Sequence, residues 1–220
     1  MDERILTRQE ASDAVGDDGW RLLLGALRAS VAVGSLAEAA DAAARAVAAC
    51  GDHADTHLRL DVRADRVSLV LQTVAVGAVT ARDVDLARRI TAAGLATEPG
   101  TPRPVQVVEI AIDALDIPAV RPFWKTLLGY ADEPGDGGAL IDPAAQGPAV
   151  WFQQMDAPRP QRNRIHLDIC VPHDEAPARI MAALASGGRL VSDAQAPAFW
   201  VLADAEGNEA CVTTWQGRDD

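Results

Sequence analysis

The segment "NRIHLDICVP", residues 163–172, carries an imidazole and a carboxylate two positions apart in an alternating apolar pattern. Successive side chains of a β-strand point to opposite faces, so His166 and Asp168 share one face of the predicted strand. Such a pair can tune a general base, or it can satisfy itself by an internal hydrogen bond. A further acid, Glu109, stands alone in the apolar run "VVEIAID". These three side chains are candidates for acid–base or metal-assisted chemistry.

The segments that must position these side chains repeat along the second half of the chain. The strand "VQVVEIAIDAL" precedes the predicted helix "DIPAVRPFWKTLLGY" and the strands "GALIDP" and "AVWFQQMD". The strand with His166 precedes the predicted helix "DEAPARIMAALASGG" and the strands "RLVSD", "FWVLADAEG" and "NEACVTTW". We interpret both halves as strand, helix, strand, strand, strand. Such a unit leaves one sheet face uncovered, and two copies enclose that face as a ligand cup.

The first half of the chain predicts two helices around a hairpin. "SLAEAADAAARAVAAC" has Ser35 as a candidate N-cap and Gly51 after its end, and its nearly continuous apolar character predicts a largely buried helix. "THLRLDVRADRVSLVLQTVAV" alternates on both sides of "RAD", which is typical of a hairpin. "TARDVDLARRITAAGL" predicts a second helix with Thr80 as its N-cap.

A proline-rich stretch separates the two halves. "ATEPGTPRPVQ" forbids a continuous helix, so we place a boundary at residues 100–104. A chain of 220 residues exceeds a typical domain of roughly 100–150 residues. We therefore expect domains at residues 1–99 and 104–217. The predicted fold class is α+β, with a helix and antiparallel-sheet sandwich followed by paired β-α-β-β-β modules.

The composition excludes several classes of partner. The formal net charge is −12 and Lys125 is the only lysine, so we expect no nucleic-acid partner. No apolar run approaches the roughly 18–20 residues that span a bilayer, so we expect no membrane partner and a soluble, cytoplasmic protein. Cys50, Cys170 and Cys211 lack C-x-x-C spacing, which predicts buried thiols rather than disulfides or a zinc knuckle.

Three segments of the repeated halves carry a family resemblance: "FWKTLLGY", "RIHLDICV" and "LADAEGNEACV". Together with the repeated order, they resemble the glyoxalase-like, bleomycin-resistance-like branch of the vicinal oxygen chelate superfamily. The resemblance covers about half the chain and implies the paired-module fold. In members that use a metal, it implies ligands at the start of the first strand and the end of the last strand of each half. Carried to this sequence, the resemblance implies a divalent metal held by Glu109, His166 and Glu209. No cofactor is otherwise implied.

The closing ligand positions and the alternatives to a metal stay open. These positions fall near Phe152 or Gln153 in the first half, and near Glu209 or Cys211 in the second. Phenylalanine cannot coordinate a metal and a neutral glutamine is a poor ligand. A histidine inside a strand is also explained as a hydrogen-bonded core residue. Glu109 is also explained by an ion pair with an arginine such as Arg164.

Aromatic residues are concentrated in the second half, since Trp20 is the only one before residue 100. Aromatic rings make flat walls for planar ligands, and core packing is the alternative explanation. An arginine at the rim would hold an anionic ligand. The candidate ligand contacts are Trp124, Trp151, Gln153, Trp200 and Arg164.

The first half resembles the pterin-4a-carbinolamine dehydratase family over almost its whole length. The resemblance rests on "GW" at 19–20, "CGDHAD", the hairpin and "VTARDVDLARRI". The family dehydrates a hydroxylated tetrahydropterin with a His-His-Pro stretch and a later histidine. His53 matches the first of these, Ala54 replaces the second, and Val74 occupies the last position. His57 would compensate if the hairpin start turns it inward.

Three functions are compatible with these patterns. In the first, the cup binds a small planar or oxygen-bearing metabolite and performs acid–base or metal-assisted lyase or isomerase chemistry. In the second, the cup is a non-catalytic binding or sequestration module. In the third, His53 and His57 carry carbinolamine dehydration in the first domain. The partner expected in every case is a small molecule, and exposed edge strands make a homodimer plausible.

Overall fold

The computed structural model describes residues 4–95, 105–118, 121, 125, 130–135, 138–157, 165–185, 188–203 and 209–218, apart from the side chains of residues 165 and 166. The chain divides into two compact units. The first unit is Met1–Val105 with Asp219–Asp220, and the second is Gln106–Arg218. The predicted boundary at 100–104 lies outside the described residues.

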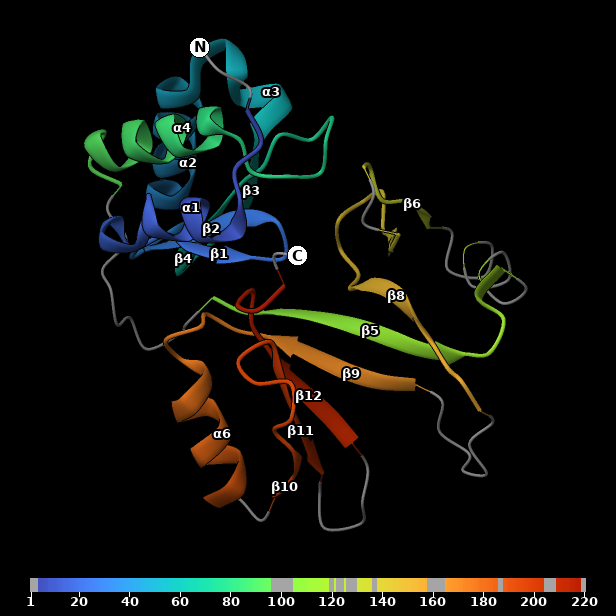
Figure 1. The fold of residues 1–220 in the computed structure, drawn as a ribbon. Helices are drawn as coiled ribbons and strands as arrows, with labels where there is room; N and C mark the ends of the chain where they lie inside the picture. Colours follow the sequence, from blue (N-terminus) through green and yellow to red (C-terminus); the bar gives the residue numbers. More distant parts are fainter. Residues whose placement is uncertain are drawn as a thin grey trace. The chain divides into compact units, whose positions relative to one another are not determined.

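The first unit has a four-stranded antiparallel sheet in the order β1-β2-β4-β3, and α2 and α4 pack against it (Figure 1). Its apolar core is formed mainly by Trp20, Leu27, Leu69, Leu71 and Ile90. The elements are α1 (Arg8–Asp13), η1 (Gly16–Asp18), β1 (Arg21–Leu23), β2 (Ala26–Ala32), α2 (Leu36–Cys50), η2 (Gly51–His53), α3 (Ala54–His57), β3 (Leu58–Arg63), β4 (Arg66–Leu71) and α4 (Ala81–Ala92).

The helix ends of the first unit follow the predicted capping chemistry. The Ser35 hydroxyl accepts the backbone N–H of Glu38 at the start of α2, and Gly51 ends this helix with a positive φ of 58°. Thr80 caps α4 in a capping box with Asp83. The expectation that α2 is largely buried is wrong. Only one stripe of it is buried, because a helix on a sheet contacts its neighbours along one side. The stripe is Ala39, Ala42, Ala46 and Cys50.

Strands β1 and β2 were not predicted. They form a hairpin in which Arg21 pairs with Arg28 and Leu23 with Ala26. The turn between them places Leu24 at φ 48° and Gly25 at φ 64°. Two successive positive φ values give the turn that suits a two-residue hairpin, and leucine rarely adopts one. This hairpin completes the sheet of the first unit.

The second unit is one eight-stranded sheet in the order β10-β11-β12-β9-β5-β8-β7-β6. In each half the first and last strands pair in parallel, and β5 joins β9 antiparallel across the two halves. The α+β class with paired modules is therefore confirmed. The elements are β5 (Val107–Ala114), β6 (Ala131–Asp132), β7 (Leu140–Ile141), β8 (Ala149–Gln154), β9 (Ile165–Cys170), α6 (Ala176–Ala185), β10 (Arg189–Ser192), β11 (Phe199–Ala203) and β12 (Glu209–Thr213).

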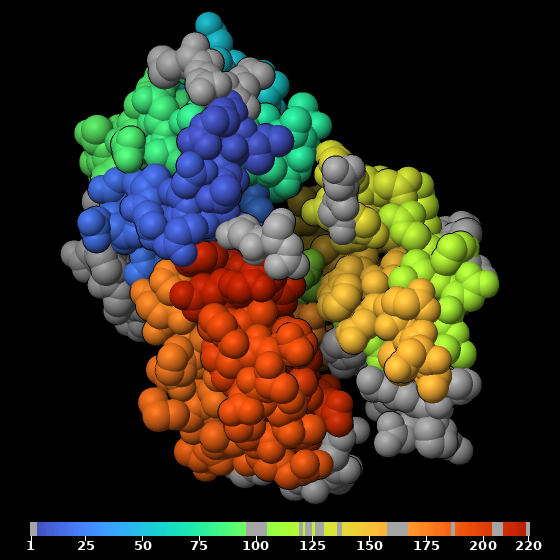
Figure 2. Space-filling view, viewed as in Figure 1, coloured from blue at the N-terminus to red at the C-terminus, as the bar shows by residue number. Residues whose placement is uncertain are grey.

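One face of this sheet is apolar and packs in part against α6. The buried cluster in the second half is Val171, Ala176, Leu202 and Val212, with Ile180 of α6 packed against it. In the first half, Ile112, Leu140 and Val150 form the corresponding cluster. Figure 2 shows a hollow between the two halves of this unit, coloured yellow-green and orange-red. Strand alternation leaves the polar residues on the other face of the sheet.

Two further expectations concern burial and the membrane. The three cysteines are buried thiols, as predicted. Within the described part of the chain, no helix has both the length and the apolar composition that a membrane span requires.

Candidate functional site

A buried imidazole–carboxylate pair lies in the first unit. His57 ends α3 immediately before β3, and Asp83 lies in the first turn of α4. The His57 Nδ1 atom is 2.8 Å from Asp83 Oδ1, and the two side chains are 5% and 0% exposed. Because both groups are removed from water, their contact is strong and their geometry is fixed. The condition on which His57 would compensate, that the start of the hairpin turns it inward, is met.

Two threonines complete this buried network. The Thr73 hydroxyl donates to Asp83 Oδ2 at 2.8 Å and lies 2.9 Å from the Thr80 hydroxyl. Asp83 Oδ2 also accepts the Thr80 backbone N–H at 2.7 Å. The carboxylate is therefore held by both its helix cap and the strand that precedes it. It orients the His57 ring, which leaves Nε2 as the nitrogen able to exchange a proton with a ligand.

The other predicted residues of this unit lie around His57. The His53 ring is half-buried and meets the His57 ring edge to face, with centroids 5.8 Å apart. Val74, at the position of the family's last histidine, is 44% exposed, and its backbone N–H donates to Thr56 O at 3.1 Å. The structure therefore brings the His53 and His57 rings together, and the backbone of Val74 contacts the segment between them.

In the second unit, a row of titratable side chains crosses three adjacent strands. Glu109 of β5 pairs directly with Asp168 of β9, and Asp168 pairs with Cys211 of β12. Directly paired residues lie on the same face of a sheet, so these groups are neighbours. Asp168 is 4% exposed. We call Glu109, Asp168 and Cys211 the acidic row.

The acidic row is electrostatically strained. The pKa of Glu109 is raised from 4.5 to about 7, mainly by burial and further by the Asp168 and Glu133 carboxylates, with Arg218 opposing them. Burial also raises the pKa of Cys211 to about 12, with the adjacent Asp168 adding to the effect. Near neutral pH, Glu109 can therefore both donate and accept a proton, whereas Cys211 stays a thiol.

The raised pKa of Glu109 predicts that the free energy of unfolding depends on pH. In the unfolded chain Glu109 ionises near pH 4.5, and in the folded chain near pH 7. The folded state holds the proton more tightly, so its stabilisation is complete below about pH 4.5 and is lost as the pH rises through 7. We expect Glu109→Gln to raise the free energy of unfolding at pH 8 by about 2–3 kcal/mol. At pH 4.5 the variant and the wild type should agree. Urea unfolding at both pH values measures the difference.

The control for this prediction is Asp156→Asn, which removes an exposed carboxylate of the same unit. It should change stability by less than about 0.5 kcal/mol at either pH. Equal stability of the Glu109→Gln variant and the wild type at pH 8 would contradict the assigned cause.

The remaining predicted residues of the second unit divide between the two faces. The register places residue 166 opposite Ala111, and Ala111 also pairs with Trp151. Alternation puts these positions, with Gln153 and the exposed Glu209, on the face of the acidic row. Phe152 packs in the apolar cluster instead, so Gln153 is the closing position on the polar face.

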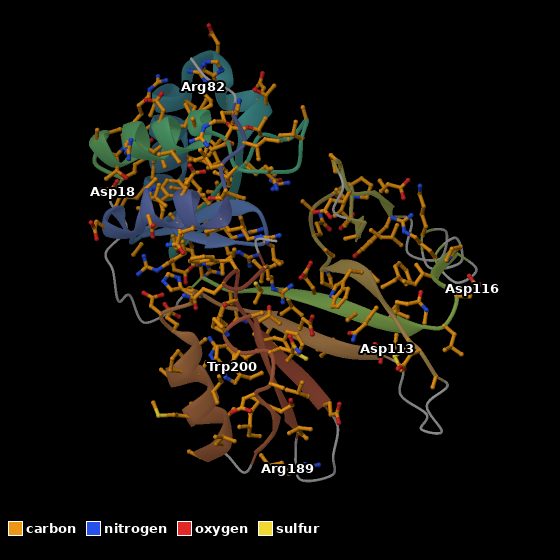
Figure 3. The ribbon with its side chains drawn as sticks, viewed as in Figure 1. Asp18, Arg82, Asp113, Asp116, Arg189 and Trp200 are labelled. Atoms are coloured by element: carbon orange, nitrogen blue, oxygen red, sulfur yellow. The ribbon has the colours of Figure 1, made fainter. Side chains whose placement is uncertain are left out.

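Trp200 lies on the other face from the acidic row. It packs against the buried cluster beside α6, as Figure 3 shows, and so contributes to the core. Figure 3 also labels Asp113, a buried acid at the far end of β5 that shares the face of Glu109. Trp124, Arg164 and the His166 side chain lie outside the described residues.

The predicted metal ligands do not form a centre by themselves in the described part of the chain, where no group of three or more His, Cys, Asp or Glu side chains is placed to hold an ion. Glu109 and Asp168 are adjacent, but Cys211 is a protonated thiol beside them rather than a thiolate ligand. The described side chains alone therefore do not fit a metal.

Sequence reasoning missed Asp83, Thr73 and Thr80 as members of a site. Thr80 and Asp83 were visible only as helix-capping residues. The hydrogen bond between the His57 ring and the Asp83 carboxylate spans 26 residues and depends on how α4 packs against the hairpin. The one available signal in the sequence was the capping box of Thr80 and Asp83, in which the acid is followed by apolar residues of the buried face of α4.

Comparisons with known proteins agree with the division of the chain into two units. Residues 4–93 match the model of the family "Pterin 4 alpha carbinolamine dehydratase", and residues 109–213 match "Glyoxalase-like domain". A "Putative pterin-4-alpha-carbinolamine dehydratase" of Mycobacterium avium (strain 104) is 38% identical over 87 residues, which are 39% of this chain and 92% of that protein.

Two solved structures are each similar to part of the chain. A transcriptional coactivator/pterin dehydratase from Brucella melitensis is 26% identical with a TM-score of 0.37, covering 41% of this chain and 98% of that one. A glyoxalase/bleomycin resistance protein/dioxygenase superfamily member from Vibrio splendidus 12B01 is 14% identical with a TM-score of 0.34, covering 50% of this chain and 99% of that one. Through its first unit, the chain belongs to the pterin-4a-carbinolamine dehydratase family, and it carries a glyoxalase-like domain after it.

Proposed function

We propose that the first unit binds a 4a-hydroxytetrahydropterin and removes water from it by acid–base chemistry at His57. The observation that carries the proposal is the 2.8 Å bond between His57 Nδ1 and Asp83 Oδ1 in a unit of this family. Loss of water from a carbinolamine needs one proton supplied to the leaving hydroxyl group and one proton taken from the neighbouring N–H, so that a C=N bond forms and one water molecule leaves. A neutral imidazole held by a carboxylate can take up and return a proton at its free nitrogen. We propose that the half-buried His53 ring, which meets the His57 ring edge to face, lines the approach of the substrate.

The test is the rate at which the purified chain accelerates dehydration of 4a-hydroxytetrahydropterin over buffer, followed by stopped-flow absorbance. Acceleration that saturates with substrate is expected. Saturable pterin binding without acceleration would instead support a binding module, and neither binding nor acceleration would overturn the proposal.

The apolar Val74 predicts how this activity can be raised. Its side chain stands where the family carries an imidazole, beside the chain segment that leads to His57. We expect Val74→His to increase kcat/KM for the pterin by at least about 10-fold, because a second proton-transfer group becomes available. Val76→His, at another partly exposed valine of the same loop, is the matched control and should leave kcat/KM unchanged. If the Val74→His variant is no faster than the Val76→His control, the missing imidazole at position 74 does not limit the rate.

We propose as a second function that the glyoxalase-like unit binds a small planar or oxygen-bearing metabolite on the polar face. The acidic row favours this function, because Glu109, with its pKa of about 7, is suited to lyase or isomerase proton transfer. Trp151 and Gln153 on the same face would contact the ligand. A divalent metal held by Glu109, His166 and Glu209 would add Lewis-acid chemistry.

Metal content measured by mass spectrometry separates these forms of the second function. About one ion per chain, lost in His166→Ala, would support metal-assisted chemistry. An equal content in the two proteins would count against His166 as a ligand and leave proton transfer by Glu109. Ligand binding without any product would support the sequestration alternative.

We also propose a homodimer in a reducing compartment such as the cytoplasm. Strands β1 and β3 end the described sheet of the first unit, and edge strands can pair with a second copy. The buried thiols support the compartment. Light scattering of the purified chain tests the dimer, which a monomeric mass would overturn.

A further inference from the structure

We infer that Gln72 is a positioning residue whose side-chain amide fastens the loop of residues 74–77, which we call the valine loop, so that Val74 stays against the His57 site. Its consequence for pterin binding rests on the proposed dehydration, whereas the fastening of the loop does not. Val74 occupies the position of the family's last histidine, so its placement decides how the substrate fits beside His57.

The Gln72 side chain joins three separate segments of the first unit. Gln72 lies immediately after β4, and its amide nitrogen Nε2 donates to Gly77 O at 2.9 Å and to Gly25 O at 3.1 Å. Its amide oxygen Oε1 accepts a hydrogen bond from Arg59 Nη2 at 3.0 Å. A primary amide has two N–H hydrogens, so one is directed at the valine loop and the other at the turn between β1 and β2.

The valine loop and the β1–β2 turn lie close to each other at these bonds. A Cβ atom at Gly25 would lie 3.3 Å from Gly77 O and 3.7 Å from Gln72 Nε2. Gly25 also has a positive φ of 64°, and both features favour glycine. The amide of Gln72 therefore bridges two backbone carbonyls of adjacent loops, and both carbonyls lose this donor when the amide is removed.

The other side of the valine loop is attached to the candidate site. The Val74 N–H donates to Thr56 O at 3.1 Å, and Thr56 lies between His53 and His57 in the sequence. The Gln72 N–H donates to His57 O at 3.0 Å. Through its backbone and its side chain, Gln72 therefore connects the segment that carries the two imidazoles with the loop that contacts this segment.

The base of the valine loop is held without the Gln72 side chain. The Thr73 N–H donates to Ala78 O at 3.0 Å and closes the loop at its base. The Thr73 carbonyl accepts the N–H groups of Val76 and Gly77 at 3.2 and 3.0 Å. Removing the Gln72 amide should therefore loosen the outer part of the loop and leave its base in place.

The imidazole–carboxylate pair is also independent of the Gln72 amide. Asp83 is held by the Thr73 hydroxyl at 2.8 Å and the Thr80 N–H at 2.7 Å, and it contacts His57 Nδ1 at 2.8 Å. None of these bonds uses a Gln72 atom. A looser valine loop should therefore weaken substrate binding, because the loop must be ordered when the ligand binds, while proton transfer at His57 is retained.

The experiment compares Gln72→Glu and Gln72→Met with the wild type in the full chain. Both variants keep the length of the side chain and lose its N–H donors, and glutamate still accepts the Arg59 bond. Hydrogen–deuterium exchange over residues 74–77 should be about 10-fold faster in both variants, because the loop opens locally without these bonds. Exchange over α4 should match the wild type and show that the unit is folded. The KM for the pterin should rise about 10-fold, with kcat within about 2-fold of the wild type.

Gln154→Glu is the matched control, because the Gln154 amide also donates to backbone carbonyls, Leu115 O at 2.9 Å and Met155 O at 2.8 Å, in the second unit. It should leave both the exchange of the valine loop and the KM unchanged. Unchanged exchange over residues 74–77 in the two Gln72 variants would overturn the inference, and so would a lower kcat with an unchanged KM. A wild type that does not turn over the pterin, together with the expected exchange in the variants, would overturn only the proposed dehydration, so the two failures are distinguishable.

Discussion

Replacing His57 by glutamine is expected to lower kcat/KM for dehydration of 4a-hydroxytetrahydropterin by about 10²–10⁴-fold. Asp83 orients the imidazole through a 2.8 Å bond, which leaves Nε2 to exchange a proton with the substrate. Glutamine offers the carboxylate an N–H donor but cannot take up a proton near neutral pH. The measurement is the initial dehydration rate of each protein against substrate concentration at pH 7, corrected for the rate in buffer.

His53→Gln is the matched control for this variant. The His53 ring lies 5.8 Å from the His57 ring and is half-buried, so it can contact a ligand at the entrance to the site. We expect its replacement to lower kcat/KM by less than about 10-fold, because a neighbouring contact contributes binding rather than proton transfer. Urea unfolding establishes that both variants are folded. Equal losses in the two variants would show that His57 has no special role in the proton transfer.

The elements that were predicted correctly are those whose signals are local. Ser35 and Thr80 cap their helices because a hydroxyl beside free backbone N–H groups is recognisable from a few residues. His166 and Asp168 were placed on one face of their strand, because a polar residue at every second position among apolar neighbours reveals the alternation. The direct pairing of Glu109 with Asp168 across β5 and β9 follows from the repeat of the two halves.

The elements that were missed lack such local signals. The segment of β1 and β2, "RLLLGALRASVAV", shows no clear alternation before its turn, and Leu24 at a positive φ is not a residue that indicates a turn. The contact of Asp83 with His57 requires α4 to close over the hairpin. A capping residue that also orients an imidazole cannot be recognised until the helix is packed.

The face of Trp200 was ambiguous for a related reason. Strand β11, "FWVLA", is apolar at every position, so its sequence does not indicate which side faces the ligand and which faces α6. The register decides it, since Trp200 pairs with Val212 of the buried cluster. Aromatic composition alone therefore indicates a ligand wall less reliably than strand parity does.

Replacing Asp83 by alanine is expected to lower the free energy of unfolding of the first unit by about 3–5 kcal/mol. The carboxylate accepts hydrogen bonds from His57, Thr73 and Thr80, and all of these groups are buried. Alanine leaves the donors without their acceptor in a place that water does not reach, and each unsatisfied group costs about 1–3 kcal/mol before relaxation. The helix cap of α4 is lost as well. Urea unfolding followed by far-UV circular dichroism measures the change.

Two further variants separate the contribution of the Asp83 charge from that of the helix cap of α4. Asp85→Ala removes a partly buried acid from the next positions of α4 and should cost less than about 1 kcal/mol. Asp83→Asn keeps the shape and can donate from its amide to His57 Nδ1, so it should cost only about 1–2 kcal/mol while moving the imidazole proton to Nε2. If Asp83→Ala costs no more than Asp85→Ala, the buried network contributes little to stability. A folded but inactive Asp83→Asn variant would show that the carboxylate is needed for the protonation state of His57 more than for the fold.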